Sequence, residues 1–262
     1  MQPLPQPSLF LSDVHLGGFS DKKNRQLEHD LIKLIDFCQE HEIKIYILGD
    51  LFDFWMEYPG HVPSLGRKVN ERFKEYNDAL GPTLYITGNH DNWTRSYLPG
   101  IGFRIEPNYQ SLATDEQKLL LLHGDGLLTE NDGLRRPPMH QLLRNETFIK
   151  VYQTLLPPAA GLWVMKWFSR LNRFFGSFKE DITLLNSWAE KTLNEGDFDI
   201  IICGHDHFPR KKEFDFGTFL NLGTFYKHRT MAFYNNNDIN IVVWDSGSRQ
   251  LNNFYTSENK YG

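Results

Sequence analysis

Short apolar runs alternate with helical patterns along the chain. Five runs are typical of buried strands: Ser8–Leu11, Ile43–Leu48, Thr83–Thr87, Leu119–Leu122 and Ile200–Cys203. Apolar residues at helical spacing predict helices over Gln26–Glu40 and around Lys68–Leu80. Further strands are predicted at Phe219–Leu222, Thr230–Phe233 and Ile239–Trp244. This alternation predicts an α/β protein.

Residues 134–182 interrupt the alternation with a mainly helical segment. No repeat, low-complexity tract or long linker separates the segment from the rest, so we expect one domain over residues 1–262 with a helical insertion. Between Arg135 and Lys179 there are eight basic residues and one acid, Glu146, which leaves the remainder strongly acidic. A basic insertion on an acidic body predicts two tasks: carboxylates that hold cations and a surface that meets an anion.

One helix of the insertion is amphipathic. Over Leu162–Phe175 one side gathers Trp163, Trp167 and Phe168 with other apolar residues, and the opposite side holds basic residues. Leu162 and Met165 break the polar side. Such a helix is typical of a membrane interface or of contact with acyl chains. The alternative is that the aromatic stripe packs the insertion onto the core.

The overall charge and the cysteines restrict the class of protein. With 28 Lys and Arg against 33 Asp and Glu, the net charge is −5, so we expect no nucleic-acid partner. Cys38 and Cys203 lie far apart in apolar surroundings, which argues against a disulfide scaffold and favours the cytoplasm. No apolar run reaches the roughly 20 residues of a membrane span, and no signal peptide is expected. No obligate protein partner is evident.

Each of the five strand-like runs ends at a cluster of Asp, Asn, His and Gly. The clusters are Asp13-Val-His15, Gly49-Asp50-Leu-Phe-Asp53, Gly88-Asn89-His90-Asp91, His123-Gly-Asp125 and Gly204-His205-Asp-His207. Loops at the carboxyl ends of strands can converge on one site. Carboxylate, imidazole and amide donors suit Mn²⁺, Fe²⁺ or Zn²⁺. The donors are too many for one ion, whereas two ions that share a carboxylate would use them all.

These five clusters, in this order and spacing, resemble the motifs of the calcineurin-like metallophosphoesterase superfamily. The resemblance implies an α+β sandwich of two packed, mixed β-sheets flanked by helices, with two divalent metal ions and a helical cap. It assigns Asp13, His15 and His207 to the first ion. It assigns the second ion to three more residues, Asn89, His123 and His205, and the bridging position to Asp50. Water activated by the two ions would attack phosphorus.

Two further residues take catalytic roles in this resemblance. His90 would lie beside the ions, without binding them, to stabilise phosphate charge or protonate the leaving oxygen. Asp53 matches the acid that orients this histidine and raises its pKa. We interpret Asp91 and Asp125 as a helix cap or as acceptors for a ligating imidazole, and Asp206 as structural. The other histidines are expected to be solvent-exposed or incidental: His29, His41, His61, His140 and His228.

A narrower resemblance comes from Leu48–Trp55, the His123-Gly-Asp-Gly-Leu-Leu-Thr-Glu segment, the insertion and Gly204–Pro209. They are similar to the UDP-2,3-diacylglucosamine pyrophosphatases of lipid A biosynthesis. This family implies Mn²⁺-dependent cleavage to UMP and 2,3-diacylglucosamine 1-phosphate, at the cytoplasmic face of the inner membrane. Arg170, Arg173 and Lys179 would then contact the anionic part of this lipid-linked nucleotide sugar.

Within that insertion, Trp163, Trp167 and Phe168 would line the chamber for the acyl chains. The best-known branch has Arg at the position of His90 and a tyrosine shortly after residues 129–132. These departures keep open an alternative: a soluble phosphatase or phosphodiesterase that acts on a nucleotide or another phosphoester.

Overall fold

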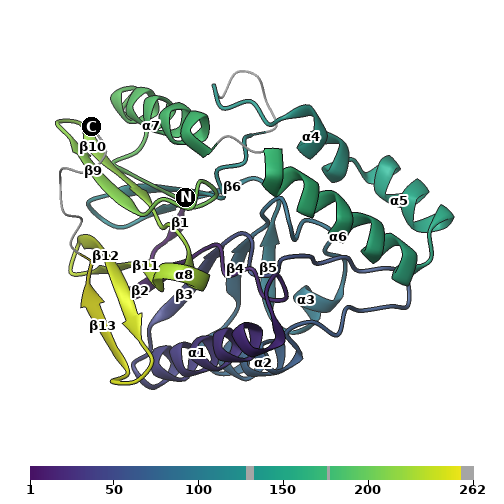
Figure 1. The fold of residues 1–262 in the computed structure, drawn as a ribbon. Helices are drawn as coiled ribbons and strands as arrows, with labels where there is room; N and C mark the ends of the chain where they lie inside the picture. The colour runs from purple at the N-terminus through teal and green to yellow at the C-terminus, as the bar shows by residue number, and fades with distance from the viewer. Residues whose placement is uncertain (128–132, 176–177, 255–262) are drawn as a thin grey trace.

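Two mixed β-sheets pack face to face at the centre of the protein (Figure 1). The computed structural model describes residues 1–127, 133–175 and 178–254, but not the side chains of residues 166, 168–175 and 178–181. In the described chain, one sheet has the order β13 (Gln250–Asn253), β12 (Asp238–Asp245), β11 (Thr230–Asn235), β2 (Ser8–Leu11), β3 (Lys44–Leu48), β4 (Thr83–Ile86), β5 (Phe103–Glu106). The other has the order β1 (Gln2–Pro3), β6 (Tyr109–Ala113), β7 (Lys118–Leu122), β8 (Ile200–Cys203), β10 (Gly217–Asn221), β9 (Arg210–Phe214).

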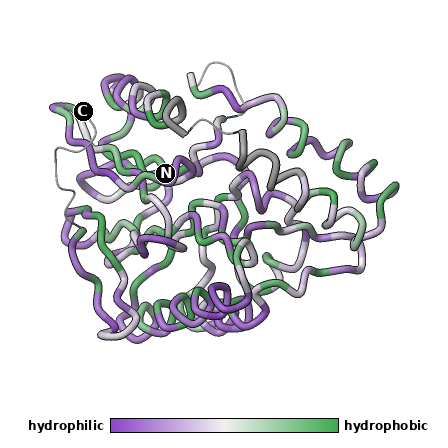
Figure 2. The backbone as a smooth tube through the Cα atoms, viewed as in Figure 1, coloured by the Kyte–Doolittle hydropathy of each residue, from purple (hydrophilic) through white to green (hydrophobic). Residues whose placement is uncertain are grey.

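Helices cover the outer face of each sheet. α1 (Asp21–Glu40) and α2 (Arg67–Leu80) lie against the sheet that contains β2 to β5, and α7 (Phe178–Asn194) lies against the other sheet (Figure 1). Strand β3 shows how both faces are filled: Ile47 packs toward the helices, and Leu48 packs between the sheets. Because both faces are covered, the central strands consist mostly of apolar residues, which Figure 2 draws in green. Two further helices, α3 (Tyr97–Gly100) and α8 (Phe225–His228), are short.

The α/β class and the predicted strands are confirmed. The helix predicted over Gln26–Glu40 begins earlier, at Asp21. The sequence does not indicate this first turn, because it is mostly exposed and carries no apolar residue. Strands β5, β6, β9 and β13 were not predicted. They lie toward the sheet edges and are only partly buried, so their sequences lack a continuous apolar run.

The insertion forms a helical cap beside the sheets. It contains α4 (Pro138–Arg144), α5 (Glu146–Leu155) and α6 (Pro158–Phe175), which project together at the right of Figure 1. Helix α7 continues beyond residue 182 to Asn194, and its Leu185 and Trp188 belong to the core of the second sheet. The predicted boundary at residue 182 therefore falls inside α7, whose later residues belong to the core.

The cap helix α6 packs through residues that interrupt its polar side in the sequence. Met165 is buried against Met56, Tyr58 and Trp93, and Leu162 is partly buried on the same cluster. Gly161 allows this approach, because a Cβ atom there would lie 1.9 Å from the hydroxyl of Tyr58. Among the described side chains of α6, Leu162 and Met165 pack onto the core, whereas Trp163 and Trp167 are exposed.

Candidate metal centre

The five polar clusters meet where the two sheets face each other. The clusters at Asp13, Asp50 and Asn89 follow the parallel strands β2, β3 and β4 of one sheet, and those at His123 and His205 follow β7 and β8 of the other. Parallel neighbours carry their carboxyl ends on the same edge, so each sheet contributes its loops to one place. The structure thus brings together all seven predicted metal ligands.

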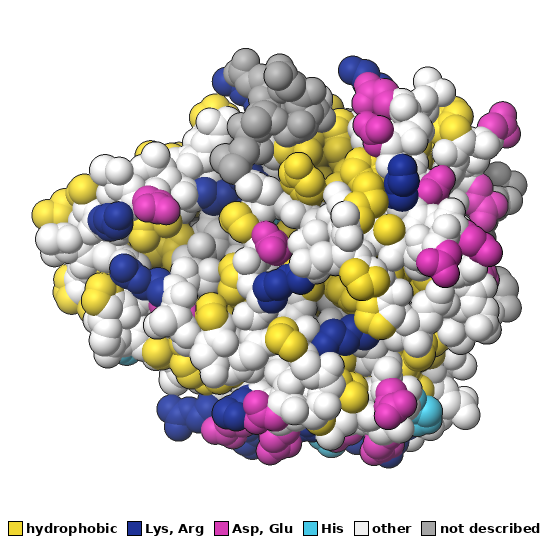
Figure 3. Space-filling model, turned by 180° about the vertical axis from the view of Figure 1, so that it is seen from behind, with side chains coloured by type: hydrophobic (Ala, Val, Ile, Leu, Met, Phe, Trp, Pro, Cys, Tyr) yellow, Lys and Arg dark blue, Asp and Glu magenta, His cyan; other side chains and the backbone are white. Residues whose placement is uncertain are grey.

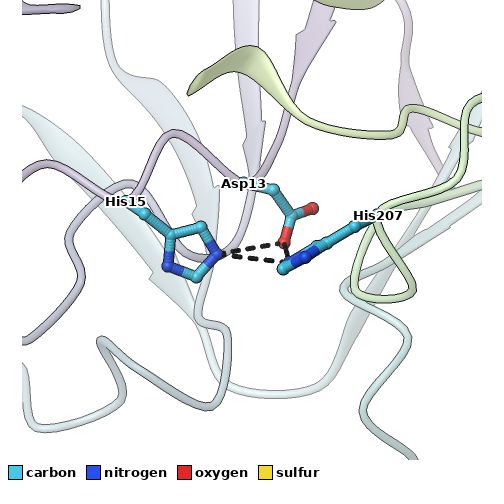
Figure 4. A group of neighbouring side chains, drawn as sticks. All are labelled: Asp13, His15 and His207. Carbon is cyan, nitrogen blue, oxygen red and sulfur yellow. Dashed lines mark hydrogen bonds and ion pairs between the residues drawn. The ribbon is translucent and has the colours of Figure 1, made fainter. Parts of the chain in front are cut away.

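Three of the predicted first-site ligands point toward one another (Figure 4). His207 Nε2 lies 3.1 Å from Asp13 Oδ1 and 3.3 Å from His15 Nε2. His15 Nε2 lies 3.6 Å from Asp13 Oδ1. Asp13 is completely buried, and the backbone N–H of His205 donates to its other oxygen, Oδ2, at 3.0 Å. This leaves Oδ1 directed at the two imidazoles.

The predicted second site adjoins the first through Asp50. Asp50 Oδ2 lies 3.6 Å from His15 Nε2 and 3.5 Å from His123 Nε2, so one carboxylate oxygen faces both groups. His123 Nε2 lies 3.1 Å from Asn89 Oδ1, and the ring of His205 stands edge-on to that of His123 at 5.2 Å. Asp50 therefore lies between the two groups of predicted ligands.

The donor atoms fit divalent metal ions. Metal–ligand bonds of about 2.1 Å place neighbouring ligand atoms about 3.0–3.4 Å apart, which is the spacing found between several of these donors. Asp13 Oδ1 is buried and faces the imidazoles of His15 and His207. Carboxylate, imidazole and amide donors are also the set that Mn²⁺, Fe²⁺ and Zn²⁺ share.

The local backbone is shaped for this convergence. Five predicted ligands have φ in the left-handed region, which non-glycine residues seldom adopt: Asp13, His15, Asp50, His205 and His207. Gly88 is required for a different reason, since a Cβ atom there would lie 2.0 Å from Asp50 Oδ1. Such backbone conformations cost free energy and persist only where the surrounding structure holds them, and they cluster at functional sites.

Charge coupling within the cluster is strong. Burial alone would raise the pKa of Asp13, but hydrogen bonds from His15 and His207 outweigh it and hold the pKa well below its ordinary value. Burial lowers the pKa of His15 and of His123, yet the surrounding carboxylates raise both to about 10. Without a metal ion, these carboxylates therefore recruit protons onto the two imidazoles.

A main-chain carbonyl orients His123. Its Nδ1 donates to the carbonyl oxygen of Leu48 at 2.8 Å, which leaves Nε2 free to bind a metal ion. Asp91 and Asp125 were expected as possible partners of a ligating imidazole, and neither is the partner found here. Asp91 accepts from the backbone N–H groups of Leu51 and Gly88 and thereby ties two metal loops together.

The two other predicted acids make structural ion pairs. Asp125 pairs with Arg144 at 3.0 Å and with the Nε of Arg136 at 3.4 Å. Asp206 accepts two hydrogen bonds from Arg210, at 2.7 and 3.0 Å, as its structural interpretation requires.

His90 lies beside the cluster, and its contact with Asp53 differs from the expected one. His90 Nδ1 lies 2.8 Å from the main-chain oxygen of Asp53, whereas the Asp53 carboxylate lies 3.4 Å from His15 Nδ1. Burial lowers the pKa of His90 and outweighs the raising effect of the nearby Asp50 and Asp53. The backbone N–H of His90 donates to Asp50 Oδ1 at 3.0 Å, so the His90 loop also orients the shared carboxylate.

His140 was expected to be incidental, and the structure corrects this. His140 lies on α4, with only 18% of its side chain exposed, and its ring stands edge-on to His205 at 6.3 Å. Its Nδ1 lies 3.9 Å from Asp125 and makes no hydrogen bond within the described residues. A single histidine on a short helix gives no periodic signal, so the sequence does not indicate its position near His205. His29, His41 and His61 are exposed, and His228 contacts Thr224.

The predicted substrate contacts are only partly within the described structure. Trp163 is 69% exposed and Trp167 is 56% exposed, so neither packs the cap onto the core. The side chains of the remaining four predicted contacts lie outside the described residues: Phe168, Arg170, Arg173 and Lys179.

A comparison with known families agrees with this geometry. The family model described as calcineurin-like phosphoesterase matches residues 7–209, which contain all five metal loops. The chain belongs to this family. As a calcineurin-like phosphoesterase it is a metal-dependent hydrolase, and its two mixed sheets with flanking helices are those of the metallophosphoesterase fold.

Two relatives carry the same name. The chain is 27% identical over 211 residues to the UDP-2,3-diacylglucosamine hydrolase of Proteus mirabilis, which covers 77% of this chain and 82% of that protein. It is 29% identical to the enzyme of that name from Neisseria gonorrhoeae, over 50% of this chain and 53% of that protein. The solved structure of YfcE, a phosphoesterase from E. coli, covers 94% of this chain and 96% of its own at 14% identity and a TM-score of 0.47.

Proposed function

We propose that this phosphoesterase hydrolyses the pyrophosphate bond of UDP-2,3-diacylglucosamine to UMP and 2,3-diacylglucosamine 1-phosphate. The observation that carries the proposal is the shared carboxylate of Asp50 between two sets of donors, which fits a pair of divalent ions. The relatives named UDP-2,3-diacylglucosamine hydrolase support the substrate. The exposed tryptophans of the cap supply apolar surface of the kind that an acylated substrate needs.

The positions of the protein groups support a reaction that uses two divalent ions. Two divalent ions, which we propose to be Mn²⁺, would neutralise the phosphate oxygens and activate water. Asp13, His15 and His207 would hold one ion, Asn89, His123 and His205 the other, and Asp50 both. The main-chain oxygen of Asp53 can only accept, so His90 donates to it through Nδ1. Nε2 of His90 is therefore the atom that holds or transfers a proton at the leaving oxygen.

We further propose that the cap contacts the inner membrane at its cytoplasmic face. No helix within the described ranges is long and apolar enough to cross a membrane. Exposed apolar side chains occur on α4, α5 and α6: Met139, Leu142, Val151, Leu155, Trp163 and Trp167. Hydrophobic side chains are visible on this projecting part, at the left of Figure 3. Tryptophan favours the interface between water and lipid, so this surface suits peripheral binding.

A turnover assay with Mn²⁺ tests the substrate. It compares UDP-2,3-diacylglucosamine, UDP-N-acetylglucosamine and bis(p-nitrophenyl) phosphate, and it identifies the nucleotide product. Strong preference for the diacyl substrate with release of UMP is the expected result. Equal turnover of the two UDP-sugars would instead indicate a soluble phosphodiesterase whose cap does not recognise acyl chains.

A further inference from the structure

One arginine of the cap reaches into the protein beneath the metal loops. Arg144 is the last residue of α4, and only 9% of its side chain is exposed. Its guanidinium touches three other segments: the end of β4, the turn before β6 and the loop that follows β7. Burial of a guanidinium between the cap and two metal loops is costly unless its charge is paired and its N–H groups are hydrogen-bonded.

The contacts of Arg144 are numerous and specific. Nη1 donates to Thr87 Oγ1 at 3.0 Å and to the carbonyl oxygen of Pro107 at 2.9 Å. Nη2 donates to the carbonyl oxygens of Thr87 and Gly88, at 3.0 and 2.9 Å, and to Asp125 Oδ2 at 3.0 Å. These five contacts engage both terminal nitrogens fully, since they carry four hydrogens between them. Arg144 is therefore committed to the protein and has no terminal donor left for a substrate phosphate.

The two loops that Arg144 joins each carry a ligand of the same predicted metal ion. Gly88 directly precedes Asn89, and Asp125 is two residues beyond His123. Asn89 Oδ1 and His123 Nε2 are 3.1 Å apart, so a small movement of either loop changes this half of the centre. The first-site group of Asp13, His15 and His207 receives none of these five contacts.

We propose that Arg144 is a positioning residue of the second metal site, through which the cap sets the distance between Asn89 and His123. The inference rests on the ligand assignment of the proposed function. Asp125 strengthens the link, since it also pairs with buried Arg136, whose Nη2 donates to the carbonyl oxygen of Gly126 at 2.7 Å. Lysine would keep the charge of Arg144, but its single nitrogen cannot bridge these acceptors together.

The test measures Mn²⁺ binding by titration calorimetry and the spin-coupled signal of two Mn²⁺ ions by paramagnetic resonance. Arg144→Lys is expected to bind the first Mn²⁺ as the wild type does and the second about 10- to 100-fold more weakly, with loss of the coupled signal. Lys150→Gln is the matched control. Lys150 lies on the next cap helix, is exposed and pairs with Glu146, so its variant should bind both ions normally.

A second variant covers the case in which Arg144→Lys does not fold. Thr87→Val keeps the shape of a buried side chain and removes one acceptor of Nη1, so the second Mn²⁺ should bind about 2- to 10-fold more weakly. Two ions bound with wild-type affinity in the folded variants would overturn the inference. A wild type that binds no Mn²⁺ would overturn both the inference and the proposed function. A wild type that binds two ions and rejects the lipid substrate would overturn the substrate alone.

Discussion

Replacing the two exposed tryptophans of α6 should release the protein from lipid surfaces without harming the fold. Trp163 and Trp167 are 69% and 56% exposed, whereas the same helix is held to the core by Leu162 and Met165. With a Trp side chain of about 250 Å², the two expose about 300 Å² together. If half of this area leaves water at about 25 cal/mol per Å², binding gains about 4 kcal/mol, or roughly 1000-fold.

The assay is sedimentation with vesicles of phosphatidylcholine that contain a quarter of phosphatidylglycerol. The Trp163→Ser, Trp167→Ser double variant should lower the partition coefficient by at least about 100-fold, which corresponds to the loss of only part of this apolar contact. Phe216→Ser is the matched control, because Phe216 is 39% exposed but lies on the β9–β10 hairpin, away from the cap (Figure 1). Equal partitioning of the double variant and the wild type would refute the role of α6 in lipid contact.

Four further expectations concern the metal centre. Asp50→Ala should abolish metal-dependent turnover, and retention of full activity would contradict a shared carboxylate. His90→Gln should lower kcat more than Mn²⁺ affinity, as separate kinetic and calorimetric measurements would show. Gly88→Ala should disrupt Mn²⁺ binding, since its Cβ would meet Asp50 at 2.0 Å. Because the pKa values of His15 and His123 are raised to about 10, Mn²⁺ must displace their protons below that pH. The apparent affinity for Mn²⁺ should therefore rise about tenfold per pH unit for each displaced proton. Calorimetry in buffers of different ionisation enthalpy measures the number of protons released.

The sequence predicts the metal loops well because their signal is local. Asp50, for example, directly follows an apolar strand and a glycine, and this order alone places it at the carboxyl edge of a sheet. The same reasoning held for His123 and His205. The motif resemblance then supplied what local patterns cannot, namely that two different sheets bring these loops to one point.

The parts that could not be predicted depend on contacts between distant segments. The short strand β6 has few apolar residues, so only its pairing with β7 and β1 identifies it. Leu162 and Met165 seemed to interrupt a polar face, but a cluster around Trp93 gives them a partner. His140 and Arg144 reach the metal loops only because the short helix α4 lies beside them, and no spacing in the sequence indicates that position.

The two tasks proposed for the cap belong to different helices, and they should be separable for this reason. Arg144, on α4, is buried among the loops that carry Asn89 and His123, whereas Trp163 and Trp167, on α6, face outward. Sites with no shared contacts usually contribute additively to the free energy. Arg144→Lys should therefore leave vesicle binding unchanged, and the tryptophan variant should retain both Mn²⁺ ions. Loss of both properties in either variant would mean that the cap acts as one rigid unit.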